Sequence, residues 1–181
     1  MKTSVFLFFT VLATGLFGQN QEVFLKDGRP FLLGKITLEA FEKEPYRNWY
    51  QKSYLDYGVD ETLIRLFKLK LADCRIQLFL GTWCGDSKRE VPRFIKILRE
   101  ADFPLENLEI IALDRRKEWY KKSPGGEEKG KNIKKVPTML FLKNGTEINR
   151  IVESPVESLE EDMALILNGD KYVPNYAVKK Q

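Results

Sequence analysis

The sequence predicts an α/β domain whose mixed central sheet has four or more strands, with helices on both faces and a mainly helical N-terminal extension. The first observation is a strand-helix-strand pattern, in which an amphipathic segment separates compact apolar runs at 76–80 and 108–113. Strands joined by such a crossover lie parallel. The second observation is the Asn144-Gly145 pair between two further apolar runs, which predicts an antiparallel hairpin.

The extension comes before the first of these strands. Residues 19–36 hold a short alternating stretch around a turn, which fits either a small hairpin or an irregular lead-in. Thr37 is expected to cap a short helical piece at 38–41, and Pro45 suits the first turn of a second piece. The second piece is rich in aromatic residues, namely Tyr46, Trp49, Tyr50 and Tyr54. Aromatic residues at helical spacing more often pack than bind, so the extension is expected to lie against the main domain.

The main domain begins with two predicted helices on either side of the strand at 76–80. Asp60 is a suitable N-cap for a helix to about Leu71. The buried face of this helix is predicted from three apolar residues, Leu63, Leu66 and Phe67. The second helix is predicted from apolar residues recurring at i, i+3, i+4 and i+7, namely Val91, Phe94, Ile95 and Leu98.

The end of the domain is predicted to be a hairpin followed by a helix. The hairpin strands fall at 138–142 and 147–152. The closing helix runs from about Pro155 to Leu167 and stops at the Asn168-Gly169 pair.

The first residues are typical of an export signal. Lys2 is the only charge before Glu22, and the apolar run from Val5 to Phe17 is too short to span a bilayer. A secretory signal peptide ending near Gly18 is therefore predicted, with a buried strand or an uncleaved anchor as the alternative. The mature chain is expected to be periplasmic or extracellular. The predicted divisions are a signal peptide at 1–18, the extension at 19–59, the main domain at 60–170 and a tail at 171–181.

Composition narrows the chemistry that this chain can perform. Histidine is absent, which excludes His-based triads, His general bases and most zinc sites. Removing Lys2 leaves 29 of the 30 basic residues against 26 acidic ones, and no nucleic-acid partner is predicted from so mild an excess. The sequence has no P-loop, dinucleotide fingerprint or metal-ligand cluster, so no cofactor is expected. No second apolar stretch is long enough to cross a membrane.

The residues that carry chemistry lie where the strand at 76–80 turns into the next helix. Cys84 there faces the unpaired amides of the first helical turn, and these amides and the helix dipole favour its thiolate over its thiol. Asp86 acts in the opposite direction, because a carboxylate in the same turn disfavours a second negative charge. A functional thiol is predicted, with an inert structural cysteine as the alternative.

Two short motifs resemble the thioredoxin family. The W-C-G-D-S run at 83–87 is similar to that family's W-C-G-P-C active site, and the V-P-T run at 136–138 is similar to its cis-proline loop. The resemblance covers roughly residues 70–169 and implies a thioredoxin-like fold with a cis peptide bond before Pro137. It implies catalytic positions at Cys84 and Ser87, and a substrate surface at Trp83, Gly85, Asp86, Val136, Pro137 and Thr138.

The departures from the family pattern define the expected mechanism. Ser87 stands where the family has its second cysteine, and Asp86 stands where it has proline. A dithiol protein attacks a disulfide with its first sulfur and releases the mixed disulfide with its second, which Ser87 cannot do. The buried polar residue that the family often has behind its cysteine is replaced by Leu78. A thiol that acts alone is therefore predicted.

Cys74 is a poor candidate for the missing second thiol. It precedes the strand whose far end leads to Cys84, and ten residues of extended chain span on the order of 30 Å. A disulfide requires Cα atoms within about 7 Å of each other. Cys74 is expected to be a small buried residue, with an intermolecular bond as the alternative.

A basic run precedes the proline loop, and its nine cationic residues are Arg115, Arg116, Lys117, Lys121, Lys122, Lys129, Lys131, Lys134 and Lys135. The ordinary interpretation is a solvated face. The alternative is that these cations favour the thiolate of Cys84 or attract an acidic partner. Trp119 and Tyr120 in the same stretch could join a partner surface, although packing is their expected use.

The leading hypothesis is an exported thiol-disulfide protein of monothiol type that forms mixed disulfides with protein thiols or disulfides, and that is a monomer. The second hypothesis is a redox-inactive module that binds peptides or proteins around Trp83, Val136 and Pro137. A third possibility is a covalent dimer through Cys74.

Overall fold

The computed structural model describes residues 19–177. The predicted signal peptide at 1–18 and the last four residues of the predicted tail lie outside the described residues. The strands in chain order are β1 (Gln21–Phe24), β2 (Pro30–Ile36), β3 (Arg75–Leu80), β4 (Leu108–Ala112), β5 (Thr138–Lys143) and β6 (Thr146–Val152). The α-helices are α1 (Tyr46–Asp56), α2 (Glu61–Ala72), α3 (Gly85–Glu100) and α4 (Leu159–Asn168). Shorter 3-10 helices are η1 (Leu38–Glu42), η2 (Leu105–Asn107) and η3 (Lys117–Trp119).

The predicted fold class is confirmed by a mixed six-stranded sheet in the order β1-β2-β4-β3-β5-β6. Strands β3 and β4 are parallel and α3 connects them, while β5 lies antiparallel to β3 and forms the predicted hairpin with β6. Of the two alternatives for residues 19–36, the structure has the hairpin, which β1 and β2 form. Strand β2 also pairs antiparallel with β4, so this hairpin extends the sheet. The N-terminal extension therefore contributes strands as well as helices.

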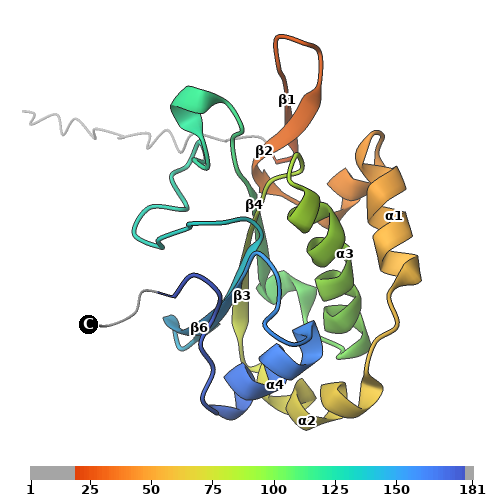
Figure 1. Cartoon of the computed structure of the whole chain (residues 1–181), viewed down its shortest axis with the longest axis vertical. Helices are drawn as coiled ribbons and strands as arrows, with labels where there is room; N and C mark the ends of the chain where they lie inside the picture. The colour runs from red at the N-terminus through yellow and green to blue at the C-terminus, as the bar shows by residue number, and fades with distance from the viewer. Residues whose placement is uncertain (1–18, 178–181) are drawn as a thin grey trace, which may run out of the picture.

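The helices are distributed unequally over the two faces of the sheet (Figure 1). All four α-helices contribute to the larger hydrophobic cluster, which includes Ile76, Leu78 and Leu80 of β3. The opposite face carries a smaller cluster built on Phe79, and the segment 114–137 covers it. Within the described chain this covering segment has η3 as its helical element. The site discussed below lies at the junction of this segment with the sheet.

The extension packs on α3 through its aromatic residues. Helix α1 lies alongside α3, and the buried Tyr50 ring stacks on Phe41 of η1 with centroids 4.9 Å apart. Thr37 stands at the predicted N-cap position, but its side chain makes no capping hydrogen bond and the helix that follows, η1, is a 3-10 helix. Thr37 instead exchanges hydrogen bonds with Asn20, whose Oδ1 accepts from the Thr37 N–H at 2.7 Å.

Helix α2 begins as predicted but turns a different face inward. The Asp60 carboxylate accepts from the N–H groups of Thr62 and Leu63, as expected of an N-cap. The buried residues are Ile64, Phe67 and Leu71, whereas Leu66 is exposed. The prediction for Leu66 is wrong because the buried stripe of this helix follows i, i+3 and i+7 from Ile64, and Leu66 lies outside that stripe.

Helix α3 matches its prediction more closely than helix α4 does. The four predicted core residues of α3, Val91, Phe94, Ile95 and Leu98, are all fully buried. Helix α4 starts at Leu159 rather than Pro155, since Ser158 caps it by accepting from the Glu161 N–H at 3.1 Å. The buried Asp162 carboxylate accepts from the N–H of Val156 at 2.8 Å. This bond holds the residues that precede the Ser158 cap outside the helix. Among residues 19–177 no helix is both long and apolar enough for a transmembrane span.

Candidate functional site

Cys84 lies at the junction of β3 and α3. The strand ends at Leu80, a tight turn follows, and the Cys84 N–H donates to the Gly81 carbonyl at 2.8 Å. Cys84 has extended backbone angles as the N-cap of α3, and its carbonyl accepts the first helical bond from the Lys88 N–H. Its side chain is half-buried and it forms no disulfide. The sulfur therefore occupies the predicted position at the positive end of the helix dipole.

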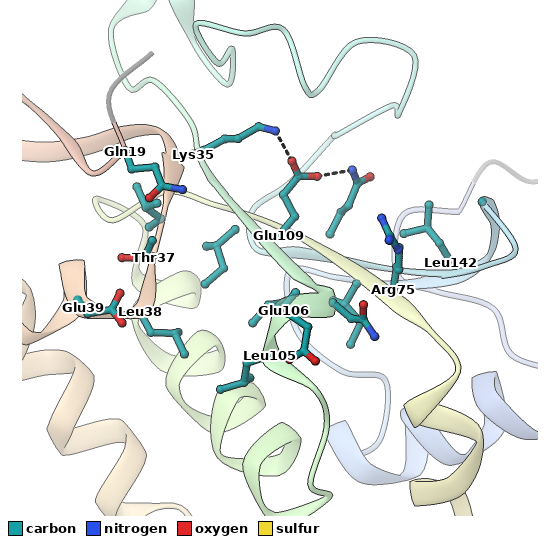
Figure 2. Close-up of a pocket in the computed structure, with 17 residues that line it drawn as sticks. Gln19, Lys35, Thr37, Leu38, Glu39, Arg75, Leu105, Glu106, Glu109 and Leu142 are labelled. Atoms are coloured by element: carbon teal, nitrogen blue, oxygen red, sulfur yellow. Dashed lines mark hydrogen bonds and ion pairs between the residues drawn. The ribbon is translucent and has the colours of Figure 1, made fainter. Parts of the chain in front are cut away.

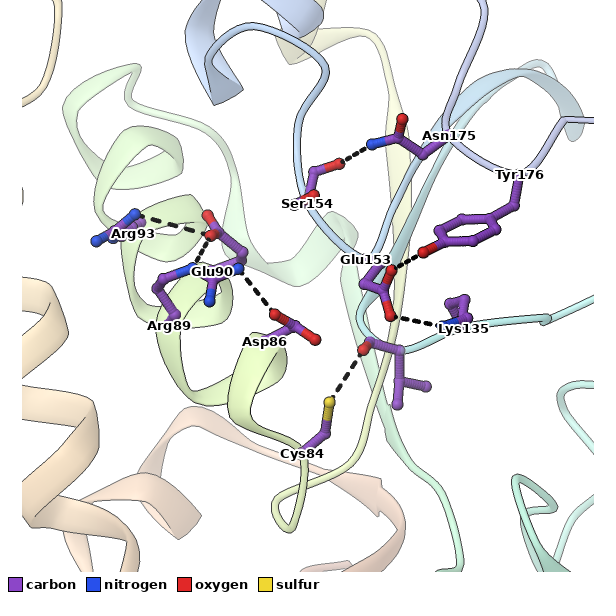
Figure 3. A network of polar contacts seen from close by, with 11 residues as sticks. Cys84, Asp86, Arg89, Glu90, Arg93, Lys135, Glu153, Ser154, Asn175 and Tyr176 are labelled. Atoms are coloured by element: carbon purple, nitrogen blue, oxygen red, sulfur yellow. Dashed lines mark hydrogen bonds and ion pairs between the residues drawn. The ribbon is translucent and has the colours of Figure 1, made fainter.

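The proline loop lies directly opposite Cys84. The Val136–Pro137 peptide bond is cis, as the resemblance implied, and the Cys84 thiol donates to the Val136 carbonyl at 3.2 Å (Figure 3). The side chains of Val136, Pro137 and Thr138 are buried, and the Thr138 hydroxyl donates to the Lys135 carbonyl at 2.7 Å. The two motifs, separated by about fifty residues in sequence, thus meet at a single hydrogen bond.

The arrangement of elements identifies the fold. Strands β3 and β4 are parallel, β5 is antiparallel to β3, and β6 is antiparallel to β5. Cys84 stands at the N-cap position of α3 and a cis-proline precedes β5, which is the arrangement that the resemblance implied. The chain has a thioredoxin-like fold.

Comparisons with known proteins were made by sequence and by structure. No protein-family model and no curated protein matches the sequence. Solved structures that resemble it include a Pseudomonas aeruginosa protein of unknown function, at 17% identity and a TM-score of 0.43 over 68% of this chain and 81% of that one. Others are Fasciola hepatica thioredoxin, at 17% identity and a TM-score of 0.37 over 60% and 91%, and an HIV epitope-scaffold, at 18% identity and a TM-score of 0.43 over 69% and 83%.

Ser87, which the resemblance aligns with the family's second cysteine, is fully buried in the first turn of α3. Its hydroxyl oxygen accepts from the Gly81 N–H at 3.2 Å, which ties the helix start to the end of β3. No hydrogen bond joins Ser87 to Cys84 in the part of the chain that the structure describes. The Ser87 hydroxyl therefore holds the turn and does not contact the Cys84 sulfur.

Trp83, Gly85 and Asp86 form the exposed side of the site. The Trp83 indole N–H donates to the Leu113 carbonyl at 3.0 Å, and its ring packs on Tyr120 with centroids 5.4 Å apart. Gly85 is exposed and Asp86 is half-buried. The Asp86 carboxylate accepts from Arg89 at 2.8 Å, so a cation offsets part of the charge that would oppose a thiolate at Cys84.

Gly81 is required by the Trp83 indole that folds over it. A Cβ at Gly81 would lie 2.6 Å from the indole, whereas a Cβ at Gly85 would meet nothing within 4 Å. The substitution Gly81→Ala is expected to lower the free energy of unfolding by about 1–3 kcal/mol by overpacking, and Gly85→Ala is expected to leave it unchanged or raised. Urea denaturation followed by tryptophan fluorescence measures both. Equal stability of the two variants would contradict this arrangement.

The members of the basic run differ in their surroundings. Arg116 pairs with the buried Asp114 at 2.5 Å, and Lys135 pairs with Glu153 at 2.9 Å. Lys121, which donates to the Lys134 carbonyl, has a pKa below its usual value. Burial is the main cause, the nearby Lys135 adds to it, and the negative charge of Cys84 acts in the opposite direction. The run is therefore not a uniform solvated face, because Arg116 and Lys135 are paired and Lys121 is partly buried.

The predicted tail folds back beside the proline loop, an arrangement that no pattern in the sequence indicates. The Glu153 N–H donates to the Pro137 carbonyl at 2.7 Å, and the Tyr176 hydroxyl donates to the Glu153 carboxylate (Figure 3). The bond from Tyr176, reinforced by Lys135, lowers the pKa of Glu153 despite partial burial. This network braces the loop from the side away from Cys84.

A second unpredicted contact connects the extension to the site. The Thr82 hydroxyl, buried in the turn before Cys84, accepts from the Leu32 N–H of β2 at 3.1 Å. The added hairpin therefore holds the turn in place as well as extending the sheet.

Cys74 is remote from the site, as predicted. It is buried at the opposite end of β3, and burial raises the pKa of its thiol. With all of β3 between them, the two cysteines cannot form a disulfide without rearrangement of the strand.

A cavity of about 770 Å³ lies at the other end of the sheet and is lined by residues of β2, β3, β4 and η2 (Figure 2). Glu109 accepts from Lys35 and Gln77 there, both at 2.6 Å. Burial alone would raise the pKa of Glu109, but these two donors outweigh it and lower the pKa. None of the predicted site residues lines this cavity. Over residues 19–177, no cluster of three or more potential metal ligands occurs.

Proposed function

We propose that this chain is an exported thioredoxin-like protein that forms mixed disulfides with partner proteins through Cys84 alone. The observation that carries the proposal is the half-exposed Cys84 sulfur at the start of α3, 3.2 Å from the carbonyl before cis-Pro137. Backbone amides of the helix start favour a thiolate there. Removal of residues 1–18 during export is part of the proposal.

The reaction is a thiol-disulfide exchange in two steps. Cys84 loses its proton to solvent, and the thiolate attacks one sulfur of a partner disulfide. A bond forms between the two proteins while the partner's own S–S bond breaks, and its second sulfur leaves as a thiolate that takes up a proton. An external thiol then attacks the mixed disulfide and frees Cys84. The buried hydroxyl of Ser87 cannot perform that second step.

Partner contact is expected to use two kinds of group. Trp83, Gly85 and Asp86 offer accessible surface around the sulfur. Val136, Pro137 and Thr138 have buried side chains, so this segment would contact an incoming chain through its backbone. The carbonyl of Val136, which accepts from the free thiol, becomes available to the partner when the thiol ionises.

Lys121 is expected to speed the reaction of Cys84. Its ammonium group attracts the thiolate, so Lys121→Gln should slow alkylation by iodoacetamide at pH 7 about two- to fivefold, which corresponds to an interaction below about 1 kcal/mol for partly exposed charges. Lys117→Gln, an exposed change in the same segment, is the matched control and should have no effect. High salt should reduce the difference between native protein and Lys121→Gln. A rate unaffected by both salt and substitution would refute this role.

The experiment that tests the proposal is the capture of mixed disulfides from the compartment into which the protein is exported. Free thiols are blocked with N-ethylmaleimide, and complexes are compared on non-reducing gels for native protein, Cys84→Ser and Cys74→Ser. The native protein and Cys74→Ser should give the same reducible complexes, and Cys84→Ser should give none. Complexes that persist in Cys84→Ser and vanish in Cys74→Ser would assign the chemistry to Cys74 instead.

The second candidate is a redox-inactive module that binds peptides at the same surface. The observation in its favour is the Ser87 hydroxyl, which is fully committed to the turn and leaves the site without a resolving group. Under this candidate, partner binding by Cys84→Ser would equal that of the native protein, and no reducible complexes would be captured from either.

A further inference from the structure

The loop at 114–122 follows β4 and is closed by backbone bonds at its base (Figure 1). The Asp114 N–H donates to the Lys122 carbonyl, and the Lys121 N–H donates to the Asp114 carbonyl, both at 2.9 Å. Inside the loop, the buried Asp114 carboxylate accepts from the Arg116 N–H at 2.7 Å and pairs with its guanidinium. A loop fixed by these bonds holds its side chains in place before a partner arrives, which lowers the entropic cost of binding.

This loop contacts both segments that flank the Cys84 sulfur. On one side, the Tyr120 ring packs on Trp83, the neighbour of Cys84 in sequence, with centroids 5.4 Å apart. On the other side, the Lys121 ammonium donates to the carbonyl of Lys134, in the segment that leads to the cis-proline. A partner whose disulfide reaches the sulfur therefore also meets the loop.

The loop presents two aromatic rings to solvent. Trp119 is 56% exposed and Tyr120 is 50% exposed. The Lys122 ammonium lies 5.5 Å from the Trp119 ring centroid, and the Lys121 ammonium lies 5.2 Å from the Tyr120 ring centroid. Tryptophan and tyrosine side chains on a fixed backbone are typical of the residues that dominate the binding energy of protein interfaces.

The loop also carries a net positive charge. Its nine residues include five cationic and two acidic ones, which gives +3. Arg116 is paired with Asp114, whereas Arg115 and Lys122 form no ion pair with any residue that the structure describes. The other acidic residue, Glu118, is exposed. Aromatic contact area beside unpaired cations suits a chain that carries carboxylates.

We propose that the loop at 114–122 is the docking surface for an acidic segment of the partner protein, close in sequence to the cysteine that Cys84 attacks. Trp119 and Tyr120 contact the partner's chain, and Arg115 and Lys122 pair with its carboxylates. This inference rests on the proposed function, because it names the class of partner that the thiol selects. A protein is favoured over a membrane or a nucleic acid because the loop adjoins the sulfur that reacts with proteins.

The test uses short peptides with one central cysteine, activated as its 2-pyridyl disulfide and flanked by glutamates, by glutamines or by lysines. The Cys84 thiolate attacks the peptide sulfur, a mixed disulfide forms, and pyridine-2-thiolate leaves and takes up a proton. The absorbance of this product measures the rate. At low salt the glutamate peptide should react at least about tenfold faster than the glutamine peptide, and the lysine peptide should be the slowest. High salt should reduce these differences.

The double variant Arg115→Gln/Lys122→Gln should lower the ratio of the glutamate rate to the glutamine rate to below about threefold. The ratio cancels any change in the reactivity of the thiol itself. Lys43→Gln/Lys171→Gln removes two exposed charges, one before α1 and one after α4, and should leave the ratio unchanged. Trp119→Ala should slow both peptides about three- to tenfold, because it removes contact area rather than charge. Its urea unfolding midpoint should stay close to that of the native protein, since the side chain is exposed.

Failure of the thiol chemistry is separated from failure of the docking surface by measuring binding to Cys84→Ser, with peptides that have serine in place of the central cysteine. Calorimetry at low salt should show that the glutamate peptide binds at least about tenfold more tightly than the glutamine peptide. This preference, without release of pyridine-2-thiolate by the native protein, would refute the redox function but uphold the docking surface.

Two results would overturn the inference. One is a ratio of glutamate to glutamine rates near one, or a ratio that both double variants lower equally. The other is binding to phosphatidylglycerol vesicles through Trp119 with no preference among the peptides, which would assign the loop to a membrane surface instead.

Discussion

The variant Ser87→Cys is expected to reduce insulin, with dithiothreitol as reductant, at least about ten times faster than the native protein. Ser87 occupies the third position of α3, one turn after Cys84, where side chains are neighbours on the helix surface. A thiol introduced there can attack the mixed disulfide on Cys84 and release the partner, which completes the dithiol cycle. The oxidised variant should contain a disulfide between Cys84 and the introduced thiol, visible as the loss of two hydrogens by mass spectrometry.

The matched control for this gain is Ser87→Ala. It removes the hydroxyl that accepts from the Gly81 N–H, as Ser87→Cys also does, but adds no sulfur. Its insulin-reduction rate should match that of the native protein. Two results would contradict the account of position 87 as the missing resolving group. One is fast insulin reduction by the native protein. The other is an unchanged insulin-reduction rate in Ser87→Cys although its new disulfide to Cys84 forms.

Replacing Phe79 with alanine is expected to lower the free energy of unfolding by about 3–5 kcal/mol. Phe79 is fully buried at the centre of the smaller cluster, where it packs with Ile111, Leu140 and Val136 of the proline loop. The void would lie between the sheet and the segment 114–137, so the loop opposite Cys84 loses support along with the core. Urea denaturation measures the loss, and the alkylation rate of Cys84 is expected to change with it.

Phe24→Ala is the control for Phe79→Ala, because it makes the same replacement at an exposed position. Phe24 is 61% exposed on the edge strand β1, so its replacement should alter stability by less than about 0.5 kcal/mol. If the two alanine variants had equal stability, the smaller cluster would not be a structural core.

The local periodicity of the sequence predicts the core of the fold because each element there carries its own pattern. The run at 76–80 and the stripe from Val91 to Leu98 fall where the structure has β3 and α3. The resemblance to the thioredoxin family, rather than the periodicity of the sequence, predicted that Cys84 and Pro137 would lie close together. The resemblance supplied the cis bond, which composition could not.

The errors arose where long-range contacts decide the outcome. The pairing of Ile36 with Ile110 places β2 in the sheet, and no local pattern marks it. Leu66 and Ile64 are both apolar, and only the packing of α2 on α4 decides which faces inward. Tyr176 reaches Glu153 because the chain folds back after α4, a path that the polar sequence 168–177 does not encode locally.

The most direct test of the central claim is the fate of Cys84 after reaction with oxidised glutathione. The reduced mature protein is incubated with excess oxidised glutathione, and the unreacted reagent is removed by gel filtration. The modified protein is then followed by intact mass and peptide mapping. We expect a single glutathione on Cys84 that persists until dithiothreitol is added, with Cys74 unmodified. Absence of the adduct, or its spontaneous loss with formation of a Cys74–Cys84 disulfide, would contradict the claim that Cys84 reacts and has no internal partner to resolve it.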